Sequence, residues 1–324
     1  MPAAWLFPGQ GSQAVGMGRD LYQGSPAARR LLDLAGETLG FPLTRLLFEG
    51  PADDLQQTIN TQPAIVVVSL AALAALREAW TESGRGELPR PAFVAGHSVG
   101  EYAALVASGA TDEATGLRLV RERARLMRRA GEATPGGMVA VLGLPRDAVA
   151  EACRQARAQT PGSYVDVANH NAEGQVVVAG DPAGLAAASK LCQAAGARRC
   201  VPLAVSAAFH SQAMAPAAAP LAAVVESSPI GDALVPLMAS ATARPLTAAR
   251  DLREELSTQI AQPVLWADGM QRMIDAGVTT FVEFGHGKVL TGLVERLGGG
   301  LSAMAIGDTA GVRAALDWLP AHLA

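Results

Sequence analysis

This sequence is poor in aromatic residues, charged residues and cysteine. Aromatic residues make up 4% of it and charged residues 17%, whereas half of all residues are hydrophobic. A composition of this kind supports a packed core and excludes an intrinsically disordered chain. Because 324 residues exceed the usual length of one domain, we expect a large domain, alone or carrying a smaller one.

The charge balance and the cysteines exclude further classes. A formal net charge of −4 provides no positive field for a nucleic acid backbone, so no nucleic acid partner is expected. The three cysteines show no CxxC spacing, and no two of the five histidines form an HxxxH pair. We therefore predict no metal site, and we expect Cys153, Cys192 and Cys200 to be reduced core residues of a cytoplasmic protein.

No apolar run in the sequence reaches the length of a membrane span. The longest, Ala64 to Leu76, falls short of the roughly 20 residues that a spanning helix needs. The N-terminus also lacks a basic segment ahead of a long apolar one. We expect a soluble, unexported monomer with no membrane partner.

Two hydrophobic patterns divide the chain. Between about residues 15 and 132, short apolar runs alternate with helical patterns, as in a sheet flanked by helices. From about Gly136 to Val205 the predicted order is βαββαβ, the pattern of a ferredoxin-like split unit, and the α/β alternation resumes after Ser206. We predict an α/β fold with the small unit inserted. Its predicted strands are Met138–Leu144, Tyr164–Asn169, Gln175–Ala179 and Arg199–Val205, and its predicted helices are Arg146–Ala158 and Pro182–Ala195.

Residues 96–100 contain a candidate nucleophile. They read Gly-His-Ser-Val-Gly, which fits G-x-S-x-G, and they lie between a predicted strand, Ala92–Gly96, and a predicted helix, Glu101–Ala110. In such a turn the serine backbone is strained, its hydroxyl projects above the sheet, and the helix places free N–H groups beside it. The alternative is that Ser98 only caps the helix. The strand and helix on either side favour the nucleophile.

A serine hydroxyl needs a base, so a histidine must reach Ser98 in the fold. His97 is the weaker candidate because neighbouring side chains at such a turn usually point apart. His210 follows the last strand of the inserted unit, where the chain re-enters the main domain and would line the cleft. A purely structural role for His210 stays open. The other histidines lie between two asparagines, in a glycine-rich turn and at the C-terminus: His170, His286 and His322.

One arginine lies on the apolar face of a predicted helix, Glu113 to Ala130. Arg123 falls within a stripe that is otherwise apolar: Gly116, Leu119, Val120, Leu126, Met127 and Ala130. A buried guanidinium is costly unless an anion or several acceptors meet it. Arg123 is therefore either part of a structural ion pair, a side chain that reaches outward, or a site for a carboxylate, whose two oxygens match the planar guanidinium.

Together with Phe7-Pro8-Gly9-Gln10-Gly11-Ser12-Gln13, these residues resemble bacterial malonyl-CoA:acyl carrier protein transacylases over nearly the whole chain. The resemblance implies a hydrolase-like α/β domain with a parallel-sheet core, residues 1–132 and 206–324, and an inserted ferredoxin-like subdomain, residues 133–205. The other matching motifs are Thr61-Gln62-Pro63-Ala64, the run from Gly96 to Tyr102, the run from Gln175 to Gly180 and the run from Gly287 to Leu293.

The resemblance also implies roles for individual residues. Ser98 would attack the thioester of malonyl-CoA, and His210 would be its base. Gln259 matches the position whose backbone carbonyl holds the histidine, so no acidic third member is expected. The backbone N–H groups of Gln10 and Val99 would form the oxyanion hole.

Arg123 matches the arginine that binds the free carboxylate of the malonyl group. Phe209 resembles the malonyl-selective form of its motif, in which the ring fills the space of a 2-methyl branch, and this favours malonyl over methylmalonyl. The alternative is that Phe209 is a simple core aromatic residue. Gln62 and Met127 are further candidate pocket residues. His286 stands where the family often has proline, and no catalytic role is expected there.

The acceptor implied by the resemblance is the phosphopantetheine thiol of an acidic acyl carrier protein, in a ping-pong reaction that feeds fatty-acid synthesis. Four cations are candidates for receiving it: Lys190, Arg198, Arg199 and Lys288. No cofactor is expected, because neither glycine-rich turn has the spacing of a nucleotide-binding loop. A serine esterase or thioesterase, a non-catalytic carrier-binding subunit, and an acyltransferase of a polyketide or malonate decarboxylase system remain alternatives.

Overall fold

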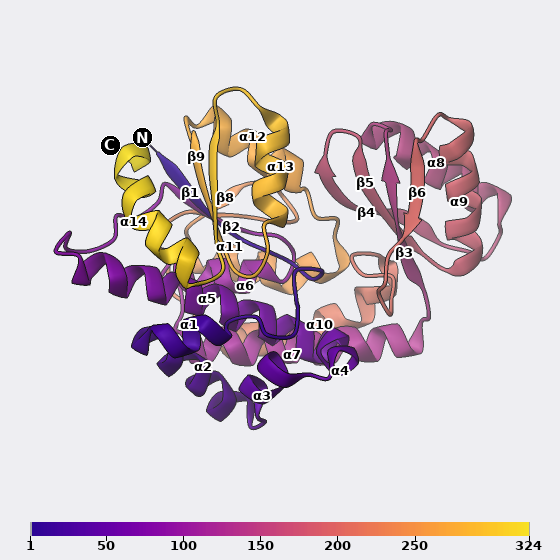
Figure 1. Cartoon of the computed structure of the whole chain (residues 1–324). Helices are drawn as coiled ribbons and strands as arrows, with labels where there is room; N and C mark the ends of the chain where they lie inside the picture. The colour runs from indigo at the N-terminus through magenta and orange to yellow at the C-terminus, as the bar shows by residue number, and fades with distance from the viewer. Residues whose placement is uncertain (1, 324) are drawn as a thin grey trace.

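A mainly parallel sheet organises most of the chain in the computed structural model, which describes residues 2–323 (Figure 1). Its order is β10-β9-β1-β2-β7-β8, and only β7 and β8 pair antiparallel. Both β1 and β9 are buried along their whole length, as expected for parallel strands covered on both faces. The strands are β1 (Ala3–Phe7), β2 (Phe93–Gly96), β7 (Leu237–Met238), β8 (Pro245–Leu246), β9 (Thr280–Phe284) and β10 (Ser302–Ile306).

Helices cover both faces of this sheet because side chains alternate along each strand. In β1, Trp5 and Phe7 join the core formed with α2, α5 and α7, whereas Ala4 and Leu6 join the core formed with α12 and α13. The helices are α1 (Arg19–Gly24), α2 (Pro26–Leu39), α3 (Leu43–Glu49), α4 (Ala52–Gln56), α5 (Thr58–Glu82), α6 (Gly100–Ala107), α7 (Glu113–Ala133), α10 (Ala215–Ser227), α11 (Ala249–Thr258), α12 (Trp266–Asp275), α13 (Val289–Leu297) and α14 (Thr309–Leu323), with short 3₁₀ turns at Gln212–Met214 and Gln259–Ala261.

The apolar run at residues 64–76 belongs to a longer helix than its sequence pattern indicates. Helix α5 has 25 residues, and by length and composition alone it would be able to cross a membrane. However, 83% of its most apolar window is buried inside the protein, where it packs against α2 and α7. Its hydropathy is therefore that of a core helix, and the expectation that no segment reaches the length of a span is corrected.

A second, antiparallel sheet has the order β4-β5-β3-β6. Together with α8 and α9 it follows the βαββαβ order, so the predicted ferredoxin-like unit is confirmed, as is the α/β fold. The last strand ends at Pro202, three residues before the predicted end. The elements are β3 (Gly137–Leu142), α8 (Arg146–Gln159), β4 (Val165–Ala172), β5 (Gln175–Gly180), α9 (Pro182–Ala194) and β6 (Arg199–Pro202). The thiols of Cys153, Cys192 and Cys200 are free, and Cys200 is only half-buried.

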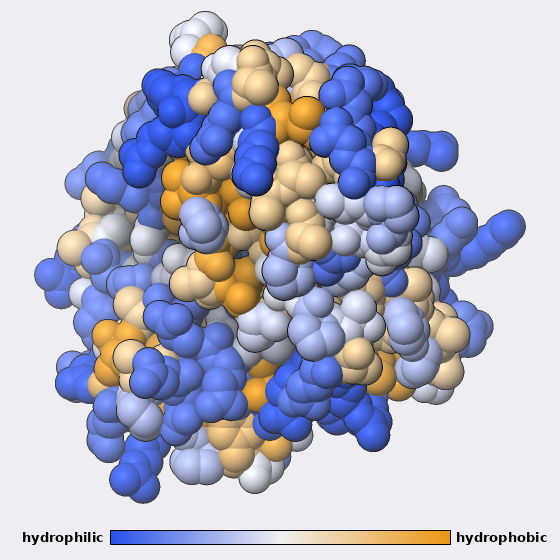
Figure 2. Space-filling model, turned by 90° about the vertical axis from the view of Figure 1, so that its right-hand side faces the viewer, coloured by the Kyte–Doolittle hydropathy of each residue, from blue (hydrophilic) through white to orange (hydrophobic). Residues whose placement is uncertain are grey.

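The two sheets meet where β4 runs past the segment before α12. The backbone N–H of His170 donates to the Val264 carbonyl at 2.8 Å, and the N–H of Val264 donates to the Ala168 carbonyl at 2.8 Å. The face at the second-sheet end of the molecule is mostly hydrophilic, and apolar side chains come through in separate patches (Figure 2). Among the described residues, the exposed large hydrophobic side chains are Val15, Leu203, Leu234, Val289 and Leu297.

Candidate active site

Ser98 lies in a strained turn between β2 and α6. Its φ of 53° is in the left-handed region, which a non-glycine residue adopts at a cost. A Cβ on Gly96 would lie 2.0 Å from the Glu101 nitrogen, and one on Gly100 would lie 2.1 Å from the Phe7 oxygen. Only glycine fits at both flanks, so the G-x-S-x-G spacing is a steric requirement of this turn.

His210 is hydrogen-bonded to Ser98. The distance from the Ser98 Oγ to the His210 Nε2 is 2.6 Å. On the other side of the ring, Nδ1 lies 3.1 Å from the Gln259 carbonyl and 3.0 Å from the Gln262 carbonyl. Because carbonyl oxygens only accept, Nδ1 carries the proton and Nε2 presents a lone pair to the serine hydroxyl. His210 is thus arranged as a base with no carboxylate behind it.

The surroundings of His210 keep its ring neutral. Its side chain is buried, and this burial, together with the positive charge of Arg123, lowers its pKa to about 3. His97 is half-buried, and its removal from water lowers the pKa of its ring as well. Its Nε2 lies 2.8 Å from the Asn171 Oδ1, so its hydrogen bond is made across the pocket and not with the neighbouring serine.

Arg123 is buried at the same place, with 1% of its surface exposed. Its Nη1 donates to the Gln62 Oε1 at 2.7 Å. Its Nη2 donates to the Gln259 Oε1 at 2.7 Å and to the Ser98 Oγ at 3.1 Å. All these acceptors are neutral, and within residues 2–323 no carboxylate lies close enough to form an ion pair with it. Its positive charge is therefore available to an anion that enters the pocket.

Gln10 and Val99 line the same pocket as Ser98. Gln10 follows β1, and its side-chain oxygen accepts a hydrogen bond from the Thr58 hydroxyl at 3.1 Å. Val99 precedes the first residue of α6. Within the described part of the chain, neither backbone N–H has an acceptor, so both can donate to a bound oxygen atom.

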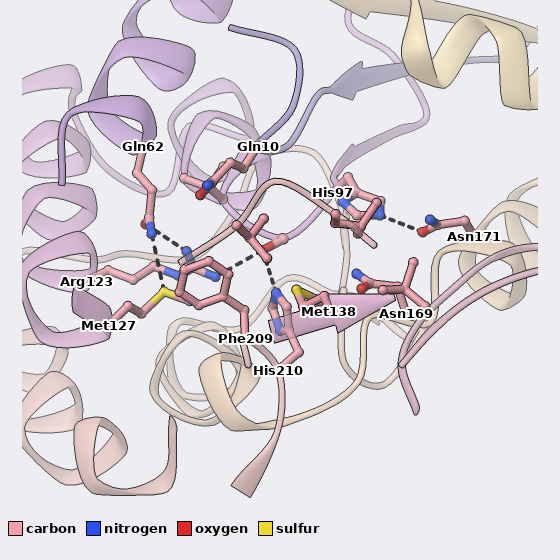
Figure 3. Close-up of a pocket in the computed structure, with 15 residues that line it drawn as sticks. Gln10, Gln62, His97, Arg123, Met127, Met138, Asn169, Asn171, Phe209 and His210 are labelled. Atoms are coloured by element: carbon pink, nitrogen blue, oxygen red, sulfur yellow. Dashed lines mark hydrogen bonds between the residues drawn. The ribbon is translucent and has the colours of Figure 1, made fainter. Parts of the chain in front are cut away.

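The pocket brings together the residues that the sequence singled out. In Figure 3, Arg123 and Gln62 reach in from the left, His210 from below, and His97 meets Asn171 at the right. Gln259 is not among the lining residues, but it is hydrogen-bonded to both Arg123 and His210. The lining residues are Gln10, Gln62, His97, Ser98, Val99, Arg123, Met127, Met138, Asn169, Asn171, Val177, Leu203, Val205, Phe209 and His210.

Comparison with known proteins assigns the chain to a family. A family model of the acyl transferase domain matches residues 4–306. Over 316 residues the chain is 42% identical to the malonyl CoA-acyl carrier protein transacylase of Bacillus subtilis, covering 98% of this chain and 96% of that one. The chain belongs to the malonyl CoA-acyl carrier protein transacylase family.

Solved structures of the transacylase family share the whole fold. An acyl carrier protein S-malonyltransferase from Vibrio cholerae has a TM-score of 0.89 and 38% identity, and the match covers 97% of this chain and 99% of that one. A malonyl-transacylase solved in complex with its type II polyketide acyl-carrier protein has a TM-score of 0.90 and 37% identity, with 98% and 99% covered. The sequence resemblance is thereby confirmed.

Several pocket residues of this transacylase were not found from the sequence. Asn169 and Asn171 come from β4, and Met138 comes from β3. The sequence does contain a signal for this pair, since the two asparagines flank His170 at the end of a predicted strand. Among residues 2–323 no group of three or more His, Cys, Asp and Glu side chains is placed to hold a metal ion.

Proposed function

We propose that the protein transfers the malonyl group of malonyl-CoA to the phosphopantetheine thiol of an acyl carrier protein through a malonyl ester on Ser98. The Ser98 oxygen bonds to the thioester carbonyl carbon while its proton passes to the His210 Nε2. The carbon–sulfur bond then breaks, and coenzyme A leaves with that proton as a thiol. The carrier thiol attacks the ester in the same way, with His210 accepting its proton and returning it to Ser98.

The negative oxygen of each tetrahedral intermediate would face the backbone N–H groups of Gln10 and Val99. Each such donor is worth about 3 kcal/mol in related acyl-transfer sites. Since neither N–H has a protein partner, no internal hydrogen bond has to break when the oxygen arrives. This supports the oxyanion role of both residues.

The observation that carries the proposal is a buried cation 3.1 Å from the nucleophile. Arg123 would pair with the free carboxylate of the malonyl group while the other end of that group is esterified to Ser98. An acyl group without a carboxylate leaves the guanidinium unpaired, which disfavours it. Phe209, buried beside His210, would restrict a 2-methyl branch, and Gln62 and Met127 would hold the arginine side of the pocket.

The proposed partners follow from the same chemistry. Residues 133–205 would form an inserted subdomain of a monomeric cytoplasmic enzyme that supplies malonyl carrier protein for fatty-acid synthesis. The acidic carrier would meet exposed cations near the cleft. We propose Lys190, Arg198, Arg199 and Lys288 for this contact.

Intact-mass measurement tests the proposal. Mixing with malonyl-CoA should add one malonyl group, peptide mapping should locate it on Ser98, and holo carrier protein should remove it within seconds. The Ser98→Ala variant is the control and should remain unlabelled. Loss of the adduct to water at the same rate without carrier would indicate a thioesterase instead, and no adduct at all would indicate a non-catalytic subunit.

A further inference from the structure

Glu101 is a buried carboxyl group for which the proposed mechanism has no use. It is the second residue of α6, three positions after Ser98, and none of its surface is exposed. Burial raises its pKa well above the usual range, and the neighbouring Glu255 carboxyl adds to this effect. A carboxyl group held in such a place costs folding stability, so its contacts need a reason beyond stability.

Both oxygens of Glu101 accept hydrogen bonds. Oε1 accepts from the backbone N–H of Ser240 at 2.9 Å, and Oε2 accepts from the Gln259 Nε2 at 2.5 Å. A backbone N–H and an amide NH₂ can only donate. The site around Glu101 therefore requires two acceptor oxygens, which a carboxyl group has and a carboxamide lacks.

The amide held by Glu101 also touches the active site. Its Nε2 is directed at Glu101 and at the Ser98 carbonyl, which is 3.2 Å away. This orientation turns its Oε1 toward Arg123, whose Nη2 donates to it at 2.7 Å. A reversed amide would place an NH₂ group against the guanidinium, with no acceptor between them.

We infer that Glu101 is a positioning residue for malonyl selectivity, which fixes the orientation of the Gln259 amide and thereby the guanidinium of Arg123. The inference rests on the proposed function, since it concerns the same carboxylate-binding arginine. The Gln259 amide that separates Glu101 from Arg123 is neutral, which matters for substrate binding. A carboxylate in direct contact with Arg123 would compete with the malonyl carboxylate, whereas Glu101 acts from one residue further away.

Glu101→Gln tests this role because it keeps the side-chain shape and replaces one acceptor by a donor. In this variant the new NH₂ group faces one of the two donors, the Ser240 N–H or the Gln259 NH₂. Rotation of the Gln259 amide by half a turn would relieve the contact between the two NH₂ groups, but Arg123 would then lose the Gln259 oxygen as its acceptor. We expect kcat/KM for malonyl-CoA, which reports the acylation of Ser98, to fall about tenfold, mainly through a higher KM. The value with acetyl-CoA should change by less than about threefold, because acetyl has no carboxylate to orient.

Glu255→Gln is the matched control. Glu255 is also a buried carboxyl, and its Oε1 accepts from the backbone N–H of Ala241 at 2.7 Å. Among the described residues it has no hydrogen bond with the Gln259 side chain, so the ratio of malonyl to acetyl rates should stay at the wild-type value. An equal change of this ratio in both variants would overturn the inference, because it would indicate only a general loss of packing.

A cycle with Gln259→Leu tests whether Glu101 acts through the amide. The double variant should show the same malonyl-to-acetyl ratio as Gln259→Leu alone, whereas additive losses would overturn the inference. If Glu101→Gln does not fold, Glu101→Asp takes its place, since it keeps both oxygens but withdraws them from Gln259. An unchanged ratio in the folded variant overturns the inference alone; failure of the wild-type protein to form a malonyl ester would overturn the proposed function.

Discussion

At the scale of single residues, backbone carbonyl groups hold His210, the proposed base. Two carbonyl groups bind the His210 Nδ1, from Gln259 and Gln262, and they fix the tautomer as a carboxylate would without adding a negative charge. The nearby charge is the positive one of Arg123, which lowers the pKa of His210 further. A bound malonyl carboxylate would offset that charge, so the base would become stronger when the correct substrate is present.

The pH profile of acylation should show this environment. Because the free enzyme holds the pKa of His210 at about 3, kcat/KM for malonyl-CoA should stay flat from pH 8 down to about pH 5. Stopped-flow acylation of Ser98 measures it. A decline centred near 6.5, the ordinary pKa of histidine, would contradict the burial of a neutral ring.

Stability should respond to the same shift in a definite direction. The pKa of His210 is lower in the folded than in the unfolded protein, so between pH 6.5 and about pH 3 the unfolded chain binds more protons. The burial of His210 therefore costs nothing above this window, and it destabilises the fold increasingly as the pH falls through it. Replacing His210 with glutamine, which does not titrate, should flatten the dependence of urea unfolding on pH, and an unchanged slope would contradict the assignment.

Arg123→Ala tests the carboxylate site directly. Loss of a buried, charged hydrogen-bonding pair should lower kcat/KM for malonyl-CoA at least about 100-fold, and acetyl-CoA should lose less than about threefold. Arg123→Lys keeps the charge but lacks the two-pronged donor, so it should fall between the wild type and alanine. Equal losses with both thioesters would remove the carboxylate role.

At the scale of elements, the serine turn depends on close backbone approaches. A Cβ on Gly100 would meet the Phe7 carbonyl, so Gly100→Ala should displace β1 or α6. We expect the unfolding free energy to fall by about 3 kcal/mol or more and the labelling of Ser98 to be abolished.

Gly292, inside α13, is the control because a Cβ there meets no atom within 4 Å. Gly292→Ala should be neutral or stabilising by up to about 1 kcal/mol. Thermal unfolding and intact mass measure both, and a harmless Gly100→Ala would contradict the steric account.

Local sterics and periodicity made some elements predictable from the sequence. The apolar stripe of α7 identified Arg123 as inward-facing, and the structure buries it. Helix α6 begins at Gly100, one residue before the prediction, but ends at Ala107, because Gly109 with φ 81° breaks the pattern. The hydrogen bond of His97 with Asn171 was not predictable, since it joins residues 74 positions apart whose separation only the fold determines.

At the scale of the whole molecule, the pocket lies where the two sheets meet. Ser98 and Arg123 come from the first sheet and its helices, whereas Asn169 and Asn171 come from β4 of the second sheet. The helical periodicity of the sequence located each part but contained no information about how they dock. Contacts that fix β4 against α12 should therefore affect substrate binding.

Asp268 of α12 makes the principal polar contact of this kind. Its Oδ2 lies 2.8 Å from the His170 Nδ1 in β4, and its Oδ1 accepts from the Arg146 Nη1 in α8 at 3.2 Å. In Asp268→Ala the His170 Nδ1 loses its partner and Arg146 keeps only the exposed Asp147, and the His170 Nε2 already has no hydrogen-bond partner among the described residues. We expect a loss of about 1–3 kcal/mol in unfolding free energy.

The kinetic effect of Asp268→Ala should appear in KM. Loosening β4 shifts Asn169 and Asn171, which line the pocket, but leaves the bond between Ser98 and His210 in place, so KM for malonyl-CoA should rise more than kcat falls. Asp147→Ala is the control, because Asp147 also pairs with Arg146, at 3.6 Å, but is 94% exposed. Its effect on stability should stay within about 0.5 kcal/mol. If the two variants behave alike in urea unfolding and steady-state kinetics, the docking of β4 on α12 does not depend on Asp268.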